Sequence, residues 1–157
     1  MKLINTIARC GLAALAISFA LGTVAHAVDE PANILKYRQN VMKAIGSNIG
    51  NIAMVAKGEV SFIGNTAMNA RAIRDGLGAA ADLFPEGTGT EAGETRALPS
   101  IWQDNAKFVA ALEKSQRAAE AMIVAAETGD IGEVRKAIGA LGKSCGGCHE
   151  DFRKKKE

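Results

Sequence analysis

The sequence predicts an all-α fold, an antiparallel bundle of four helices around one core. Apolar side chains recur at steps of three and four along four separate segments, which is the period of an amphipathic helix. No segment of the sequence has the alternating apolar and polar pattern of a strand. Two connections between the segments are short and one is long, which is compatible with an up-down-up-down arrangement.

Residues 1–27 have the features of a secretory signal peptide. Lys2 and Arg9 precede an uncharged, largely apolar run over 10–24, and Ala25-His26-Ala27 gives the small-x-small pattern of a cleavage site. The run is short for a membrane span, and the well placed cleavage pattern favours removal over an uncleaved anchor. We therefore expect an exported, periplasmic protein that is soluble after cleavage.

The mature chain, residues 28–157, is expected to form a single domain. Removing 27 of the 157 residues leaves 130, a length that suits one core. The leader takes two of the 19 basic residues, so 17 basic residues balance the 17 acidic ones. This balance predicts neither nucleic acid nor an anionic membrane as a partner. Two cysteines and one histidine remain, all within 145–149.

The first two helices are predicted over 31–57 and from Asn65 or Thr66 to about residue 83. Pro31 suits a first helical turn, Gly58 is typical of the residue after a helix, and Asn65 or Thr66 can act as an N-cap. The stripe of the first helix is Leu35, Arg38, Met42, Ile45, Ile49 and Ile52, and that of the second is Met68, Ala72, Ile73, Leu77, Ala80 and Leu83.

The third helix is predicted from Pro99 or Ser100 to Gly129, after a long connection over 84–95. This connection is rich in Gly, Thr and Glu. Loops of its length often carry function or wrap a ligand, and a mobile surface crossover is the alternative. The stripe of the third helix is Trp102, Phe108, Leu112, Ala119, Met122 and Ile123.

A fourth helix is predicted after Asp130, a suitable N-cap. Its apolar stripe continues into the C-terminal cysteines, so these are expected on the face that meets the core. A basic run over 153–156 follows, where cations favour a helix C-terminus; a solvated tail is preferred to a basic docking patch. The stripe follows steps of 4, 3, 4, 3 and 4 through Val134, Ile138, Leu141, Cys145, Cys148 and Phe152.

The segment Cys145-Gly146-Gly147-Cys148-His149 has the C-x-x-C-H pattern of covalent haem attachment. Two thiols can form thioether bonds to the haem vinyl groups, and the adjacent histidine can ligate the iron. On a helix, Cys145, Cys148 and His149 all face one side. We therefore predict one covalent haem c per chain, attached through the two cysteines, with His149 as the proximal iron ligand.

Three other roles for this motif are disfavoured. A zinc site needs two further cysteine or histidine ligands, and the remaining candidates, Cys10 and His26, lie in the leader. A thioredoxin-like redox pair needs a βαβ context, whereas the surrounding pattern is helical. A disulfide within one helical turn is geometrically awkward.

A C-x-x-C-H motif near the C-terminus of an all-helical, exported chain resembles the class II c-type cytochromes, the cytochrome c-prime family with its low-spin, methionine-ligated relatives. The likeness spans the mature chain and implies a left-handed four-helix bundle, often a homodimer through the first two helices; monomer or dimer stays open here. Its marks are Lys36-Tyr37-Arg38-Gln39 with Met42, Phe84-Pro85-Glu86-Gly87-Thr88, Thr95-Arg96-Ala97-Leu98-Pro99-Ser100-Ile101-Trp102, and Cys145 through Arg153.

The resemblance implies further haem contacts. Arg38 and Gln39 match positions near the haem propionates, and a guanidinium is a good bidentate partner for a carboxylate; an exposed helix arginine is the alternative. Thr95 is a weaker candidate for a propionate contact. Arg153 matches a basic residue over the proximal face, where it would tune the imidazole or limit access, or it belongs to a solvated terminal cluster.

Met42 matches the family's distal-face position. In cytochrome c-prime a bulky apolar residue there leaves the iron five-coordinate, whereas a methionine binds the iron in the low-spin relatives. A thioether ligand favours the ferrous form and suits electron transfer, but an unliganded methionine is the default on an apolar stripe. Because the neighbouring sequence is more similar to the low-spin branch, we expect ligation.

Two functions are therefore expected. The first is a one-electron carrier that cycles between Fe(II) and Fe(III) and serves unidentified redox partner proteins. The alternative is a five-coordinate protein that binds nitric oxide or carbon monoxide at the distal haem face. We expect no enzymatic activity, because the mature chain has no distal histidine for acid–base catalysis.

Overall fold

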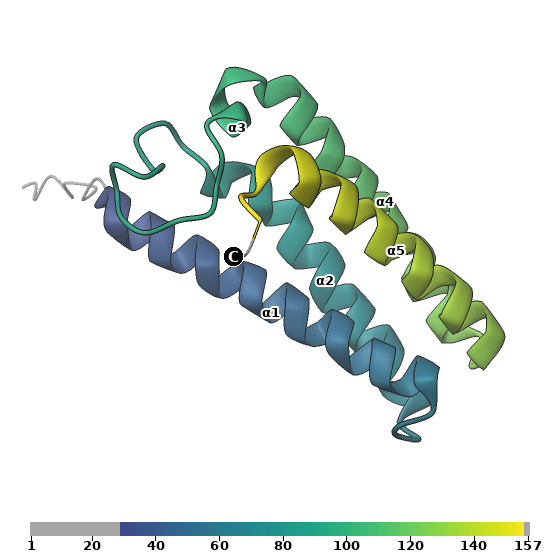
Figure 1. The fold of residues 1–157 in the computed structure, drawn as a ribbon. Coiled ribbons are helices and arrows are strands. Elements are labelled where there is room, and N and C mark those ends of the chain that lie inside the picture. Colours follow the sequence, from purple (N-terminus) through teal and green to yellow (C-terminus); the bar gives the residue numbers. More distant parts are fainter. Residues whose placement is uncertain (1–28, 156–157) are drawn as a thin grey trace, which may run out of the picture.

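The computed structural model describes residues 29–155, and the predicted signal peptide lies outside the described residues. Four long helices run alternately up and down, side by side (Figure 1). The predicted left-handed antiparallel four-helix bundle is confirmed. The long helices are α1 (Pro31–Lys57), α2 (Thr66–Ala80), α4 (Asn105–Glu127) and α5 (Ile131–Phe152), and the short ones are η1 (Ile63–Asn65), η2 (Ala81–Leu83) and α3 (Ser100–Gln103).

Two predicted helix boundaries are confirmed in detail. Gly58 follows α1 with φ 80°, a left-handed conformation that glycine adopts without strain, and its N–H donates to the carbonyl of Val55. Asp130 caps α5, because its carboxylate accepts hydrogen bonds from the backbone N–H groups of Gly132 (2.7 Å) and Glu133 (2.9 Å).

The predicted third helix is wrong as a single element, because the chain forms α3 and then α4. The two helices are separated at Asp104, which has φ −129° and ψ 57°, and its carboxylate accepts a hydrogen bond from the N–H of Lys107. A short acidic side chain that bonds the backbone favours such a new N-terminus over a continued helix.

The predicted stripe of α2 is wrong at its first two positions. Met68 is 61% exposed and Ala72 also faces solvent. The core face instead begins with Thr66, whose hydroxyl donates to the carbonyl of Ile63 at 2.6 Å, and continues through Asn69. A buried hydroxyl that satisfies its hydrogen bond locally can occupy a core position, and hydropathy alone does not reveal this.

The core runs the length of the bundle and ends in a cluster of aromatic rings. The centroids of Phe84 and Phe108 lie 4.8 Å apart, and those of Phe108 and Phe152 lie 5.2 Å apart, both with edge-on rings. Edge-on contacts at such distances are a favourable arrangement of aromatic rings. This cluster therefore packs the end of α5 against α4 and the start of the crossover. The long helices share the fully buried residues Ile52, Ile73, Met122, Val134 and Leu141.

The crossover, residues 84–99, is held to the bundle near its start. The guanidinium of Arg38 donates to the Leu83 carbonyl (3.2 Å) and to both the hydroxyl (3.0 Å) and the carbonyl (2.8 Å) of Thr88. The indole N–H of Trp102 donates to the carbonyls of Phe84 (2.9 Å) and Pro85 (3.1 Å). These hydrogen bonds therefore hold the crossover in a fixed position over one end of the bundle.

The other end of the crossover meets the segment that follows α5. Ala97 and Arg153 form an isolated antiparallel bridge. The N–H of Leu98 donates to the Phe152 carbonyl (3.0 Å), and the N–H of Lys154 donates to the Arg96 carbonyl (2.8 Å). Thus the backbone at the start of the basic run is anchored, while the side chains of Arg153 and Lys154 are exposed. None of the helices in the described range is both long and apolar enough to span a membrane.

Candidate haem site

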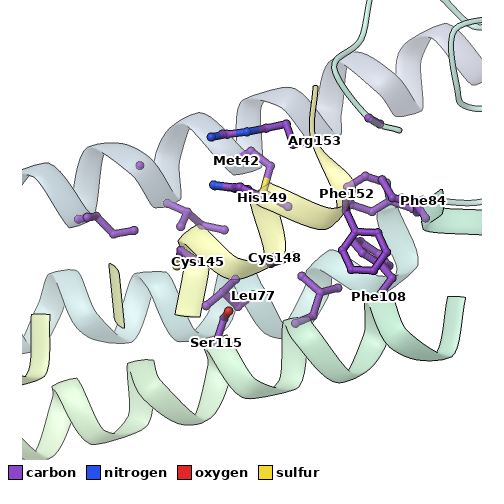
Figure 2. A pocket seen from close by; sticks show the side chains of 16 residues that line it. Met42, Leu77, Phe84, Phe108, Ser115, Cys145, Cys148, His149, Phe152 and Arg153 are labelled. Carbon is purple, nitrogen blue, oxygen red and sulfur yellow. The ribbon is translucent and has the colours of Figure 1, made fainter. Parts of the chain in front are cut away.

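An apolar cavity lies at the end of the bundle that the crossover covers. It is lined by all four long helices, by α3 and by the crossover (Figure 2). Both motif cysteines and the motif histidine line it, and they come from the last two turns of α5. The prediction that the motif cysteines lie on the face that meets the core is confirmed, because both pack against it. The apolar lining is Met42, Ile45, Ile49, Leu77, Phe84, Ala97, Ile101, Phe108, Leu112 and Phe152.

The two cysteines are half-buried free thiols. Burial raises the pKa of the Cys145 thiol, against hydrogen bonds from Ser144 and Ser115 that lower it. Burial, with the nearby charges of Cys145 and Asp151, raises the pKa of Cys148 to about 11. Both groups are therefore protonated at neutral pH, and thiolate chemistry such as metal capture is suppressed.

The imidazole of His149 is neutral at pH 7. Burial is the main cause that lowers its pKa, and the positive charges of Arg153 and Arg96 lower it further. A neutral imidazole keeps a nitrogen lone pair available, which is the state that binds a metal. The environment of His149 therefore suits an iron ligand.

Met42 reaches the cavity from α1. Figure 2 shows its side chain and that of His149 directed into the same space from two different helices. Of the methionines in residues 29–155, it alone lines the cavity. Met122 is fully buried elsewhere in the core, while Met54 and Met68 are exposed. A thioether sulfur is thus available in the same cavity as His149, from the neighbouring helix α1.

Arg38, Gln39 and Thr95 do not line the cavity. Arg38 is only 2% exposed, its guanidinium lies 4.3 Å from the Phe84 ring centroid, and burial lowers its pKa. The exposed-arginine alternative is therefore wrong. Gln39 donates to the Glu94 carbonyl at 2.9 Å, and the Thr95 hydroxyl accepts from the Ala97 N–H at 3.1 Å. Arg38 and Gln39 thus donate hydrogen bonds to residues of or next to the crossover, and Thr95 accepts one within it. The contacts of these three residues with the haem propionates remain predictions.

Ser115 is a cavity residue that the sequence reasoning missed. It is 2% exposed, donates to the Ala111 carbonyl at 3.0 Å, and hydrogen-bonds the sulfur of Cys145. A signal was present, because Ser115 lies three residues after Leu112 and four before Ala119 on the α4 stripe. Restricting the stripe to apolar residues hid a hydroxyl that packs beside the motif.

The cavity fits haem in its donors and in its polarity. Two thiols, one neutral imidazole and one thioether meet in a lining that is otherwise largely apolar. Within residues 29–155, no group of three or more His, Cys, Asp or Glu side chains is placed to hold a metal ion directly. The fold and this donor set define a class: helical-bundle proteins that carry c-type haem.

Comparison with known proteins identifies the family. The family model described as cytochrome C' matches residues 33–153. The chain is 33% identical to cytochrome c' of Rubrivivax gelatinosus over 128 residues, covering 81% of this chain and 98% of that protein. It is 35% identical to cytochrome c-556 of Agrobacterium tumefaciens over 127 residues, covering 80% and 100%. The chain belongs to the cytochrome c' family, which binds covalently attached haem c.

Solved structures agree with this assignment. The crystal structure of cytochrome c' from Rubrivivax gelatinosus superposes with a TM-score of 0.73 at 30% identity, covering 80% of this chain and 98% of that one. A nitric oxide complex of a cytochrome c prime mutant from Alcaligenes xylosoxidans gives a TM-score of 0.74 at 29% identity, covering 82% and 99%. The four-helix bundle is thus shared over almost the whole length of these relatives.

Proposed function

We propose that this protein is an exported one-electron carrier in which Cys145 and Cys148 would hold the haem covalently and His149 and Met42 would ligate its iron. The observation that carries the proposal is the position of Met42, whose side chain lines the cavity from α1 while His149 lines it from α5. Bound haem supplies the Fe(II)/Fe(III) couple. Export by residues 1–27, a mature domain over 28–157 and a homodimer through α1 and α2 belong to the same proposal.

The protein's own residues suit this couple in two ways. A thioether ligand stabilises the ferrous form, which raises the reduction potential. The apolar lining, with Phe84, Phe108 and Phe152 at one end, excludes water and disfavours the additional positive charge of ferric iron. Both effects favour a carrier that is readily reduced.

The cavity lacks the groups of a haem enzyme. In the described residues its polar lining consists of Ser115, His149 and Arg153 beside the two thiols. Ser115 donates to the Ala111 carbonyl, and His149 is assigned to the iron. No carboxylate or second imidazole lines the cavity to move a proton to or from a substrate. We therefore propose electron transfer without turnover of a substrate.

Binding of nitric oxide or carbon monoxide is the second candidate. Several relatives are named cytochrome c', and solved structures of the Alcaligenes xylosoxidans protein include nitric oxide complexes. In this case Met42 would be a distal packing residue that does not bind iron. A methionine side chain is flexible enough to move aside for a diatomic ligand.

The test compares Met42→Leu with Met122→Leu in the purified holoprotein. We expect a low-spin ferric spectrum with a sulfur-to-iron charge-transfer band, which Met42→Leu abolishes together with a gain in carbon monoxide binding. Met122→Leu should keep the band, because Met122 is fully buried away from the cavity and leucine conserves its volume. A high-spin ferric spectrum of the unmodified protein would refute ligation by Met42 and favour the second candidate.

A further inference from the structure

A second groove lies where α1 turns into α2, at the end of the bundle opposite the crossover (Figure 1). Three large side chains line it, and two of them carry a thioether sulfur. Met54 is 41% exposed, Phe62 is 62% exposed and Met68 is 61% exposed. Met54 follows Met42 by 12 residues, so it lies about 18 Å farther along α1. This groove is therefore separate from the haem site.

The two methionines are carried by helices that are tied together at this point. The side-chain amide of Asn51 on α1 donates to the side-chain oxygen of Asn69 on α2 at 3.3 Å. The amide of Asn69 in turn donates to the Asn65 carbonyl at 2.9 Å. Met54 lies one turn after Asn51, and Met68 is adjacent to Asn69. The backbones that carry the two thioethers are therefore held in a fixed relation to each other.

The donor groups of the groove are those of a soft metal site. Within the described part of the chain, its lining contains no charged side chain, thiol or imidazole. Zinc, calcium and magnesium prefer ligands of those kinds or carboxylates. Thioethers select soft ions such as Cu(I). A monovalent ion also needs less compensation than a divalent one in a neutral groove. The other polar groups are the amides of Asn51, Asn65 and Asn69.

We propose that Met54 and Met68 bind a soft monovalent metal ion, Cu(I) or its analogue Ag(I), with both thioether sulfurs as ligands. The ring of Phe62 lines the same groove, where an aromatic face attracts a cation. An apolar contact with another protein would need no sulfur, whereas two thioethers beside amide oxygens and an aromatic ring form a donor set for a soft cation. The site does not depend on whether Met42 ligates the haem iron.

The experiment is a calorimetric titration of the ferric holoprotein with silver nitrate in a chloride-free buffer. The ferric form is used because ferrous iron can reduce Ag(I). We expect one Ag(I) ion to bind per chain. Met54→Leu and Met68→Leu should each weaken binding at least about tenfold, because even a residue that only supports a metal ligand is worth about 10–100-fold in affinity. Leucine has a similar volume and both positions are exposed, so the fold should be kept.

Met122→Leu is the matched control. It makes the same substitution at a fully buried methionine that does not line the groove, so the affinity for Ag(I) should not change. Phe62→Leu should weaken binding by only about two- to fivefold, which corresponds to an exposed cation–π contact. Zinc nitrate is the control for the type of ion, and Met54→Leu should not alter any binding of Zn(II).

The location of the ion is tested by NMR of the holoprotein labelled with ¹³C in the methionine methyl groups. Ag(I) should shift the signals of Met54 and Met68 together and leave that of Met122 in place. The haem absorption spectrum should not change, because the groove is separate from the haem site.

Three results would overturn the proposed metal site. The first is Ag(I) binding that neither Met54→Leu nor Met68→Leu weakens. The second is a shift of only one of the two methyl signals, which would exclude joint ligation. The third is binding that changes the haem spectrum, which would place the ion at the haem attachment.

Discussion

The structure assigns Arg38 a role in holding the crossover, and replacing it with methionine measures that role. Arg38→Met keeps an unbranched apolar stem and removes the guanidinium. Three hydrogen bonds to Leu83 and Thr88 are lost, each worth about 1 kcal/mol net. A cation–π contact with Phe84 of about 1 kcal/mol is also lost. Burial of the methionine returns about 1 kcal/mol, which leaves a net loss of about 3 kcal/mol.

The assay is urea unfolding of the holoprotein, together with limited proteolysis of residues 84–99. We expect a lower unfolding midpoint and faster cleavage within the crossover. Arg135→Met is the control, because the Arg135 side chain is exposed and makes one hydrogen bond, to the Ala56 carbonyl at 2.6 Å. It should cost about 1 kcal/mol or less and leave cleavage of the crossover unchanged.

A double-mutant cycle separates this role from the predicted propionate contact. If Arg38 acts through Thr88, then Arg38→Met and Thr88→Val should be coupled by about 1 kcal/mol or more, because both remove the same hydrogen bond. A loss below about 1 kcal/mol with no coupling, accompanied by a changed haem spectrum, would refute the structural role and favour a contact with the haem.

Two further predictions concern the core and the attachment. Phe108→Ala should cost about 3–5 kcal/mol in urea unfolding, because the ring is 2% exposed and packs edge-on against two others; Phe62→Ala, at a ring that is 62% exposed, should cost less than about 0.5 kcal/mol. Cys148→Ala should keep haem on the chain in a denaturing gel through Cys145, and the double Cys145→Ala, Cys148→Ala variant should release it. Retention of haem by the double variant would refute attachment through the motif.

Local signals made much of the fold predictable from the sequence. Gly58 and Asp130 mark helix ends through the backbone conformation or hydrogen bonds of one residue, so they are readable without knowing the rest of the chain. The α5 stripe runs unbroken into Cys145 and Cys148, which placed the motif on the core face. The helical spacing of the α1 stripe likewise included Met42, and the structure places this residue in the lining of the cavity.

The remaining features depend on partners far away in the sequence. Arg38 looked like a haem contact or an exposed side chain, and its acceptor Thr88 lies 50 residues away. The bridge between Ala97 and Arg153 is one residue pair, which is too short to produce a strand pattern. The break at Asp104 had a local signal in its aspartate, but the apolar stripe on both sides concealed it.

Whether Met42 can ligate the haem iron depends on the position of α1 relative to α5 and not on the residue type alone. Met42 is on α1 and His149 is on α5, and ligation of one iron by both requires a fixed separation between these helices. The crossover is bonded to α1 through Arg38 and Gln39 and to the end of α5 through the bridge. It therefore ties together the two elements that carry the candidate ligands. If Met42 ligates the iron, Arg38→Met should therefore weaken this ligation as well as the attachment of the crossover.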